Sequence, residues 1–113
     1  CIETAAWLRG RGAGAVVLTR GSAPVLWWCG ERSGSAAPPV VEAVDTLGAG
    51  DVFHGALALA LARALPGRRS GGGGAARIAP ATLADAVASA CAVAAASTEH
   101  FGTRAWIGAI PGW

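Results

Sequence analysis

The run from Asp45 to Ala56 places small residues directly before a pattern of helix formers, and it constrains the fold more than any other segment. It reads Asp-Thr-Leu-Gly-Ala-Gly-Asp-Val-Phe-His-Gly-Ala. Large apolar residues then recur every fourth position, and alanine, the best helix former, fills many of the positions between them. Leucines at alternate positions also suit a strand, but the run is long for one. We predict a helix over residues 50–65, buried on most sides and ended by Pro66-Gly67.

The start of this helix suits a negatively charged ligand. The first backbone N–H groups of a helix have no partner inside it, and the helix dipole adds positive potential there. With glycines at positions 48 and 50, an anion such as phosphate can approach these amides closely. Asp51 then stands beside the anion, where its carboxylate can accept a proton from an attacking hydroxyl. The spacing alone leaves open that Asp51 is only a helix cap and the glycines only a turn.

The segments before this motif predict a small α/β arrangement. Ala15 to Thr19 is β-branched and reads as a buried strand, and Pro24 to Cys29 reads as a second strand that pairs with it as a hairpin. The neighbouring tryptophans Trp27 and Trp28 are expected on opposite faces of that strand. The flanking segments are predicted as a helix end at Ile2–Arg11, a turn at Arg20–Ser22, a loop at Gly30–Pro39 and a short extended segment at Val40–Val44.

After the motif helix, the sequence predicts a connector and one more helix. Residues of about 67–79 contain four consecutive glycines and read as a flexible connector, since no strand precedes them and no lysine follows. A helix is expected from Ala81 to Ser97, with Thr82 as its cap. Its apolar stripe is Leu83, Val87, Cys91 and Ala94. The order of elements predicts an α/β fold that forms the last part of a sheet-and-helix sandwich, with too few strands for a complete doubly wound domain.

Composition excludes several classes of function. The net charge is only +2 and the arginines form no stripe, so we expect no nucleic-acid partner. All basic residues are arginine, which excludes a Walker-type phosphate loop because that loop requires lysine. Three cysteines lie far apart and without a neighbouring histidine, which argues against zinc and a disulfide framework. No signal peptide is visible, and the apolar runs are too short and alanine-rich to predict a membrane span.

The run Asp45 to Ala56 resembles the second motif of the ribokinase-like (PfkB) carbohydrate kinases, Asp-Thr-x-Gly-Ala-Gly-Asp-x-Phe-x-Gly-Ala, at every fixed position. The resemblance implies that Asp51 is the catalytic base and that the amides from Gly48 through Ala49 and Gly50 to Asp51 form the anion hole for the transferred phosphoryl group. It also implies a role for Asp45 in binding a monovalent cation, usually potassium. His54 falls at a position that the family leaves variable, and we expect it to pack or to lie partly exposed.

Weaker similarity extends to both sides of this motif. Val16 to Gly21 resembles the family strand that ends in Thr-x-Gly, which implies that Thr19 and Gly21 lie near the nucleotide phosphates. Ala92 to Gly102 resembles the helix and loop that cover the adenine and complete the cation site, which implies roles for Gly102 and Ser97.

The resemblance implies ATP-dependent phosphorylation of a sugar or sugar-like alcohol, with Mg²⁺ and K⁺ as cofactors. The scattered cysteines suit thiols in a reducing cytosol, so we expect a cytoplasmic protein, and a homodimer as its assembly. Family members are considerably longer, and their sugar site, di-glycine motif and lid lie in an N-terminal half that is absent from residues 1–113. We therefore expect a C-terminal fragment whose sheet has an unpaired edge. Two alternatives stay open: a nucleoside or vitamin-type kinase, and a non-catalytic nucleotide-binding remnant or interaction module.

Overall fold

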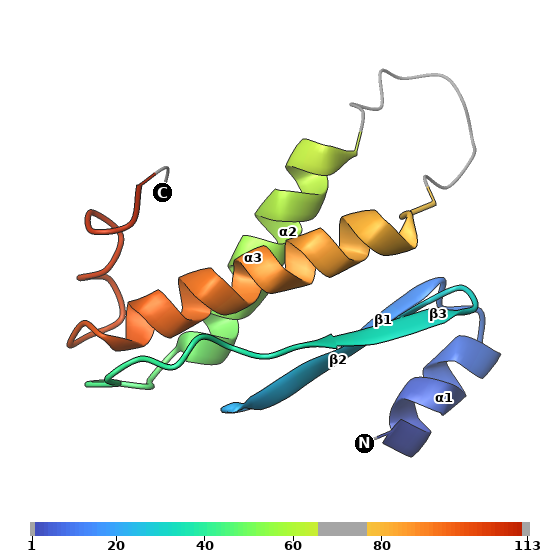
Figure 1. The fold of residues 1–113 in the computed structure, drawn as a ribbon, viewed down its shortest axis with the longest axis horizontal. Coiled ribbons are helices and arrows are strands. Elements are labelled where there is room, and N and C mark those ends of the chain that lie inside the picture. Colours follow the sequence, from blue (N-terminus) through green and yellow to red (C-terminus); the bar gives the residue numbers. More distant parts are fainter. Residues whose placement is uncertain (1, 66–76, 112–113) are drawn as a thin grey trace.

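The computed structural model of the chain describes residues 2–65 and 77–111. A three-stranded sheet forms the middle of the fold, α3 crosses one face of it, and α2 packs along α3 (Figure 1). Helix α1 contacts β1 and lies on the opposite side of the sheet from α3 (Figure 1). The elements are α1 (Ile2–Gly10), β1 (Ala15–Arg20), β2 (Ala23–Cys29), β3 (Arg32–Ala36), α2 (Ala49–Ala64) and α3 (Pro80–Thr98). The predicted α/β class is confirmed.

The sheet is an antiparallel meander in the order β1-β2-β3. The predicted hairpin between β1 and β2 is confirmed, with Val17 opposite Trp27. The prediction of a loop over Gly30–Pro39 is wrong, because β3 pairs with β2 within that range. Its serine and glycine residues have low strand propensity. The segment nevertheless forms an edge strand, which is held by backbone pairing with β2 and by packing of Trp27 against Gly34. The segment 40–44 forms no strand.

The two faces of the sheet differ in what covers them. Val25 and Cys29 on β2 are buried against the helices, with Val17 and Trp27 packed beside them. The alternate positions point to the other face, where the side chains remain only half-buried; they are Val16, Leu18, Leu26 and Trp28. Trp27 and Trp28 thus lie on opposite faces, as predicted. The strand Ala15–Thr19 was predicted to be buried, but its residues reach at most half-burial because one face is only partly covered.

Helix α3 contributes most of the core. Leu83, Val87 and Cys91 are buried along one stripe, and they pack with Phe53 of α2. The predicted cap at Thr82 is wrong: α3 begins at Pro80, whose missing N–H and fixed φ suit the first helical position. Helix α2 is less buried than predicted, since Phe53 and Ala56 are its buried residues and the opposite side faces solvent. The predicted Pro66-Gly67 stop and most of the glycine connector lie outside the described residues.

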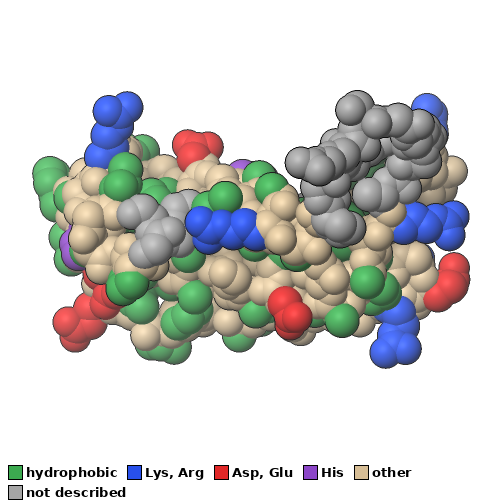
Figure 2. All heavy atoms as spheres, turned by 90° about the horizontal axis from the view of Figure 1, so that it is seen from above, with side chains coloured by type: hydrophobic (Ala, Val, Ile, Leu, Met, Phe, Trp, Pro, Cys, Tyr) green, Lys and Arg blue, Asp and Glu red, His purple; other side chains and the backbone are tan. Residues whose placement is uncertain are grey.

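The described residues include one helix, α3, that is long and apolar enough to cross a membrane by length and composition. This property contradicts the expectation that the apolar runs are too short. Nearly half of the apolar window of α3 is buried inside the fold, and one such helix is weak evidence for a membrane span. Seen from above, charged side chains are spread over the molecule with apolar and small residues between them (Figure 2).

Candidate active site

The glycine turn before α2 has the conformation that its sequence requires. Gly48 precedes the helix with φ of 80°, a left-handed conformation that disfavours any residue with a Cβ. The first bond of the helix runs from the Val52 N–H to the Gly48 carbonyl at 2.9 Å. Asp51 lies in the first helical turn and is exposed. The turn and the helix start are therefore built by Gly48 and not by a capping side chain.

The backbone amides at this helix start differ in whether they make a hydrogen bond within the described residues. The Ala49 N–H donates to the Thr46 carbonyl at 3.2 Å, which closes the turn. Among the residues that the structure describes, no hydrogen bond uses the N–H of Gly50 or Asp51. Both amides belong to the first turn, where the helix dipole concentrates positive potential. The two amides can therefore receive an anion, whereas Ala49 would have to exchange its turn hydrogen bond for one.

Asp45 joins the motif to the loop that follows α3. Its Oδ1 accepts a hydrogen bond from the Leu47 N–H at 2.9 Å, and its Oδ2 accepts one from the Gly102 N–H at 3.0 Å. These two backbone donors, Leu47 first, lower the pKa of the Asp45 carboxyl below its ordinary value. The carboxylate therefore stays ionised, and each oxygen keeps a lone pair for a further contact.

The carbonyl of Thr98 strengthens the same junction. It accepts hydrogen bonds from the N–H groups of Val44 at 2.7 Å and Asp45 at 3.0 Å. Ser97 is buried next to it, but its hydroxyl donates to the Ala94 carbonyl within α3 and makes no hydrogen bond to Asp45 in the described part of the chain. The structure thus brings Asp45 and Gly102 together, and it leaves the Ser97 hydroxyl occupied inside its own helix.

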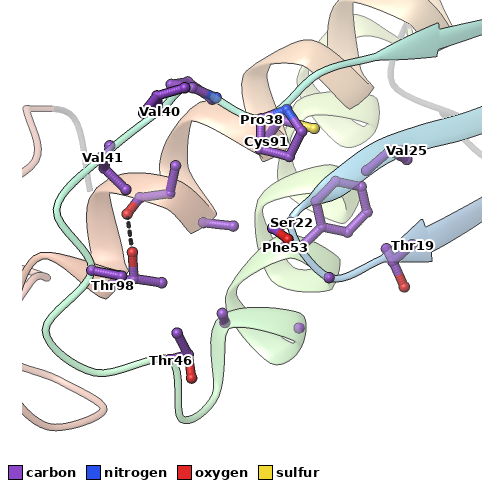
Figure 3. A pocket seen from close by; sticks show the side chains of 17 residues that line it. Thr19, Ser22, Val25, Pro38, Val40, Val41, Thr46, Phe53, Cys91 and Thr98 are labelled. Atoms are coloured by element: carbon purple, nitrogen blue, oxygen red, sulfur yellow. Dashed lines mark hydrogen bonds between the residues drawn. The ribbon is translucent and has the colours of Figure 1, made fainter.

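A cavity of about 730 Å³ opens beside the start of α2 (Figure 3). Thr19 near the end of β1 and Gly21 in the β1–β2 turn line it together with Ala49 and Gly50 from the motif. Gly21 has φ of 63°, so the turn that contributes it also needs glycine. The volume falls in the range of small-molecule sites. The structure therefore places these four predicted residues around one space, whereas Gly48, Asp51, Asp45, Gly102 and Ser97 do not line it.

The remaining wall of the cavity was not predicted. The labelled side chains of Val25 and Phe53 lie on one side of the space, and those of Val40 and Val41 lie across from them on the loop after β3 (Figure 3). Cys91 of α3 also lines the cavity, and burial raises the pKa of its thiol. The small residues at successive positions near the end of α3 were the available signal, because they leave room for a neighbouring molecule; they are Ala94 and Ala95.

No group of three or more histidine, cysteine, aspartate or glutamate side chains able to hold a metal ion occurs within residues 2–65 and 77–111. Cys29 and Cys91 are free and buried, and the Cys29 thiol donates to the Ile78 carbonyl at 3.1 Å.

The fold of this chain matches solved kinases. Aminoimidazole riboside kinase from Salmonella enterica, solved with aminoimidazole riboside and an ATP analog, has 28% identity and a TM-score of 0.72 over 92% of this chain and 31% of that chain. Ribokinase from Thermotoga maritima has 28% identity and a TM-score of 0.69 over 96% of this chain and 30% of that chain. Fructokinase from Vibrio cholerae O395, solved with fructose, ADP and calcium ion, has 26% identity and a TM-score of 0.72 over 92% of this chain and 30% of that chain.

The chain thus spans about three tenths of the length of these solved kinases. Their shared fold is the one described above: a sheet with helices packed against it. The sequence model of the pfkB family carbohydrate kinases matches residues 1–108, which is nearly the whole chain. This chain therefore belongs to the pfkB family of carbohydrate kinases.

Proposed function

We propose that the chain is the C-terminal portion of a kinase that transfers the γ-phosphoryl group of ATP to a hydroxyl of a sugar or sugar-like small molecule. The observation that carries the proposal is the start of α2, where two unengaged amides, Gly50 and Asp51, adjoin an exposed carboxylate on Asp51. Phosphoryl transfer needs positioning and charge stabilisation more than covalent chemistry, and this combination supplies both.

In this proposal, Asp51 accepts the proton of the attacking hydroxyl while the hydroxyl oxygen forms its bond to the γ-phosphorus. The bond from that phosphorus to the bridging oxygen breaks, and ADP leaves. The amides of Gly50 and Asp51, together with the turn at Gly48 and Ala49, stabilise the negative charge on the transferred group. The carboxylate and the amides lie in one helical turn, so the base and the charge-stabilising groups keep a fixed relation.

The nucleotide is proposed to occupy the cavity beside this helix start. Thr19 and Gly21 line the cavity together with Ala49 and Gly50 of the motif, where they can approach phosphates, and the apolar wall suits a planar base. Mg²⁺ is proposed to arrive on the nucleotide, where it neutralises phosphate charge. Asp45 is proposed to support a monovalent cation, because its ionised carboxylate lies at the junction with the Gly102 loop; Ser97 remains a weaker candidate. A cytoplasmic location and a homodimer complete the proposal.

The test is a coupled assay of ADP production by the complete open reading frame, with a panel of sugars, nucleosides and vitamin-like alcohols. We expect turnover with one class of acceptor and strict dependence on ATP. Circular dichroism verifies that the protein is folded. If folded protein produces no ADP with any acceptor of the panel, the kinase proposal is contradicted.

One comparison favours a second acceptor class. Aminoimidazole riboside kinase carries its riboside in the solved complex, and it matches this chain as well as the sugar kinases do. A nucleoside-like acceptor is therefore the alternative substrate, and preferential turnover of ribosides over free sugars in the same panel would establish it.

A non-catalytic role is the remaining alternative. The chain covers about three tenths of each of these solved kinases. Reading the gene upstream of Cys1 distinguishes the two. An in-frame segment with the di-glycine motif supports the kinase, and a nearby stop codon supports a nucleotide-binding remnant or an interaction module.

A further inference from the structure

The side chain of His54 folds back onto the start of its own helix. Its Nδ1 lies 2.7 Å from the carbonyl oxygen of Gly50, one helical turn earlier. Helical side chains lean toward the helix N-terminus, which brings the ring of residue 54 to the carbonyl one turn earlier. A carbonyl oxygen can only accept, so the shared proton belongs to Nδ1. His54 therefore donates a hydrogen bond to the Gly50 carbonyl in the first turn of α2.

The imidazole is held in this orientation by a buried neighbour. The ring of Phe53, which is 4% exposed, meets the His54 ring edge-on, with centroids 5.8 Å apart and planes at 89°. Edge-to-face contacts of this kind are favourable and directional. The His54 side chain is itself exposed, so the aromatic contact and the hydrogen bond fix its position without a surrounding cavity.

The carbonyl that His54 engages belongs to the same peptide group as the Asp51 N–H. In a helix, this carbonyl points toward the C-terminus and the N–H points out of the N-terminal end. The carbonyl has two lone pairs, so it can accept from Nδ1 in addition to its helical bond. A second donor polarises the peptide group and makes its N–H a stronger donor, by about 10–30% per bond. That N–H is one of the two amides at the start of α2, Gly50 and Asp51, that make no hydrogen bond within the described residues.

We propose that His54 is a positioning residue for phosphoryl transfer: it orients and polarises the Gly50–Asp51 peptide whose N–H receives the transferred phosphoryl group. This inference rests on the proposed function of the helix start. His54 touches neither substrate, and it acts through a backbone group that the proposed mechanism uses.

The test compares His54→Leu with His54→Asn in the complete protein. Asparagine places its Nδ2 donor where imidazole has Nδ1, whereas leucine fills similar space without a donor. Leucine is also the better helix former, so a purely structural role predicts that His54→Leu is at least as good as His54→Asn. We expect the reverse: His54→Asn keeps kcat within about twofold, and His54→Leu lowers kcat by about threefold to tenfold with little change in the acceptor KM. Arg63→Gln, exposed at the other end of α2, is the matched control and should change neither value.

A spectroscopic measurement separates this inference from the proposed function. In ¹⁵N-labelled protein, the Asp51 amide signal is followed while inorganic phosphate is added. A parent protein whose Gly50 and Asp51 amides do not respond to phosphate would overturn the anion site and the inference with it. Amides that respond in the parent, together with an Asp51 resonance that is the same in His54→Leu and His54→Asn, would overturn the inference alone. A shifted Asp51 resonance and weaker phosphate response in His54→Leu, restored in His54→Asn, would establish it.

Discussion

The Asp45 carboxylate accepts a 3.0 Å hydrogen bond from the Gly102 N–H, which joins the turn before α2 to the loop after α3. The two residues are 57 positions apart in the chain. Next to them, the Thr98 carbonyl receives the Val44 and Asp45 N–H groups. The helix start and the far end of α3 are thus fixed to one another through the backbone and one carboxylate.

This junction predicts a pH-dependent stability. The Asp45 pKa is lowered in the folded chain by the Leu47 and Gly102 donors, while the unfolded chain has the ordinary value of about 3.9. Between these two values the unfolded state binds more protons, so the contribution of Asp45 is complete above the unfolded value and declines as pH falls through the folded one. Urea unfolding of the parent and Asp45→Asn from pH 7 to pH 2.5 measures it. We expect the parent's advantage to shrink below about pH 4, and a constant difference would contradict the assignment.

The two glycines of the turn predict opposite responses to alanine. Gly48 has φ of 80°, so Gly48→Ala should cost about 1–2 kcal/mol of unfolding free energy. A Cβ at Gly50 meets nothing within 4 Å, so Gly50→Ala should leave stability unchanged or improved. If the Gly50 amide receives phosphate, the new methyl group should still weaken phosphoryl transfer. Thermal melts and kinetics of both variants decide this, and full activity in a stable Gly50→Ala would argue against an anion at this position.

Gly34 predicts a local packing defect on substitution. A Cβ added there would lie 2.5 Å from the ring of Trp27 on the neighbouring strand. Overpacking of this kind costs about 1–3 kcal/mol, so Gly34→Ala should lower the free energy of unfolding by that amount. Gly55→Ala is the control, because nothing lies within 4 Å of its Cβ and alanine favours the helix. Equal effects of the two substitutions in urea titrations would show that the Trp27 contact is absent.

The sheet predicts association of residues 1–113 when they are produced alone. Strand β1 pairs only with β2 among the described strands, and the face with Val16, Leu18 and Trp28 is only half-covered. Unpaired edges and apolar faces promote self-association. Sedimentation velocity should show species larger than a monomer that grow with concentration, and Leu18→Lys should reduce them. A monomer at all concentrations, with cooperative unfolding, would contradict this prediction.

The sequence predicted the parts of the fold that have strong local signals. The helix at Ala49–Ala64 followed from the four-residue spacing of Phe53 and Leu57. Strand β1 followed from a short β-branched run, and β2 followed as its hairpin partner after a glycine turn. Strand β3 was missed because its Ser/Gly sequence has no alternation, and its pairing depends on β2 and on Trp27 packing over Gly34.

The site was predictable where short local motifs contribute to it, as with Asp45 to Asp51 and with Thr19 and Gly21, which line the cavity. Asp45 to Asp51 gave the turn and the helix start, but the bond from Asp45 to Gly102 and the cavity wall at Cys91 arise from tertiary packing between distant segments. The engagement of the Ala49 amide by Thr46 and of the Gly50 carbonyl by His54 depends on local backbone geometry. Residue spacing does not report such geometry.

The most direct test of the central claim is the rate of phosphoryl transfer from ATP by the complete protein, compared between the parent and Asp51→Asn. Asparagine keeps the size of the side chain and removes its ability to accept a proton. We predict a loss of about 10²- to 10⁴-fold in kcat, the usual contribution of a general base. Asp85→Asn, which changes an exposed carboxylate on α3, should leave the rate unchanged. An Asp51→Asn protein as active as the parent would contradict the assignment of Asp51 as the base.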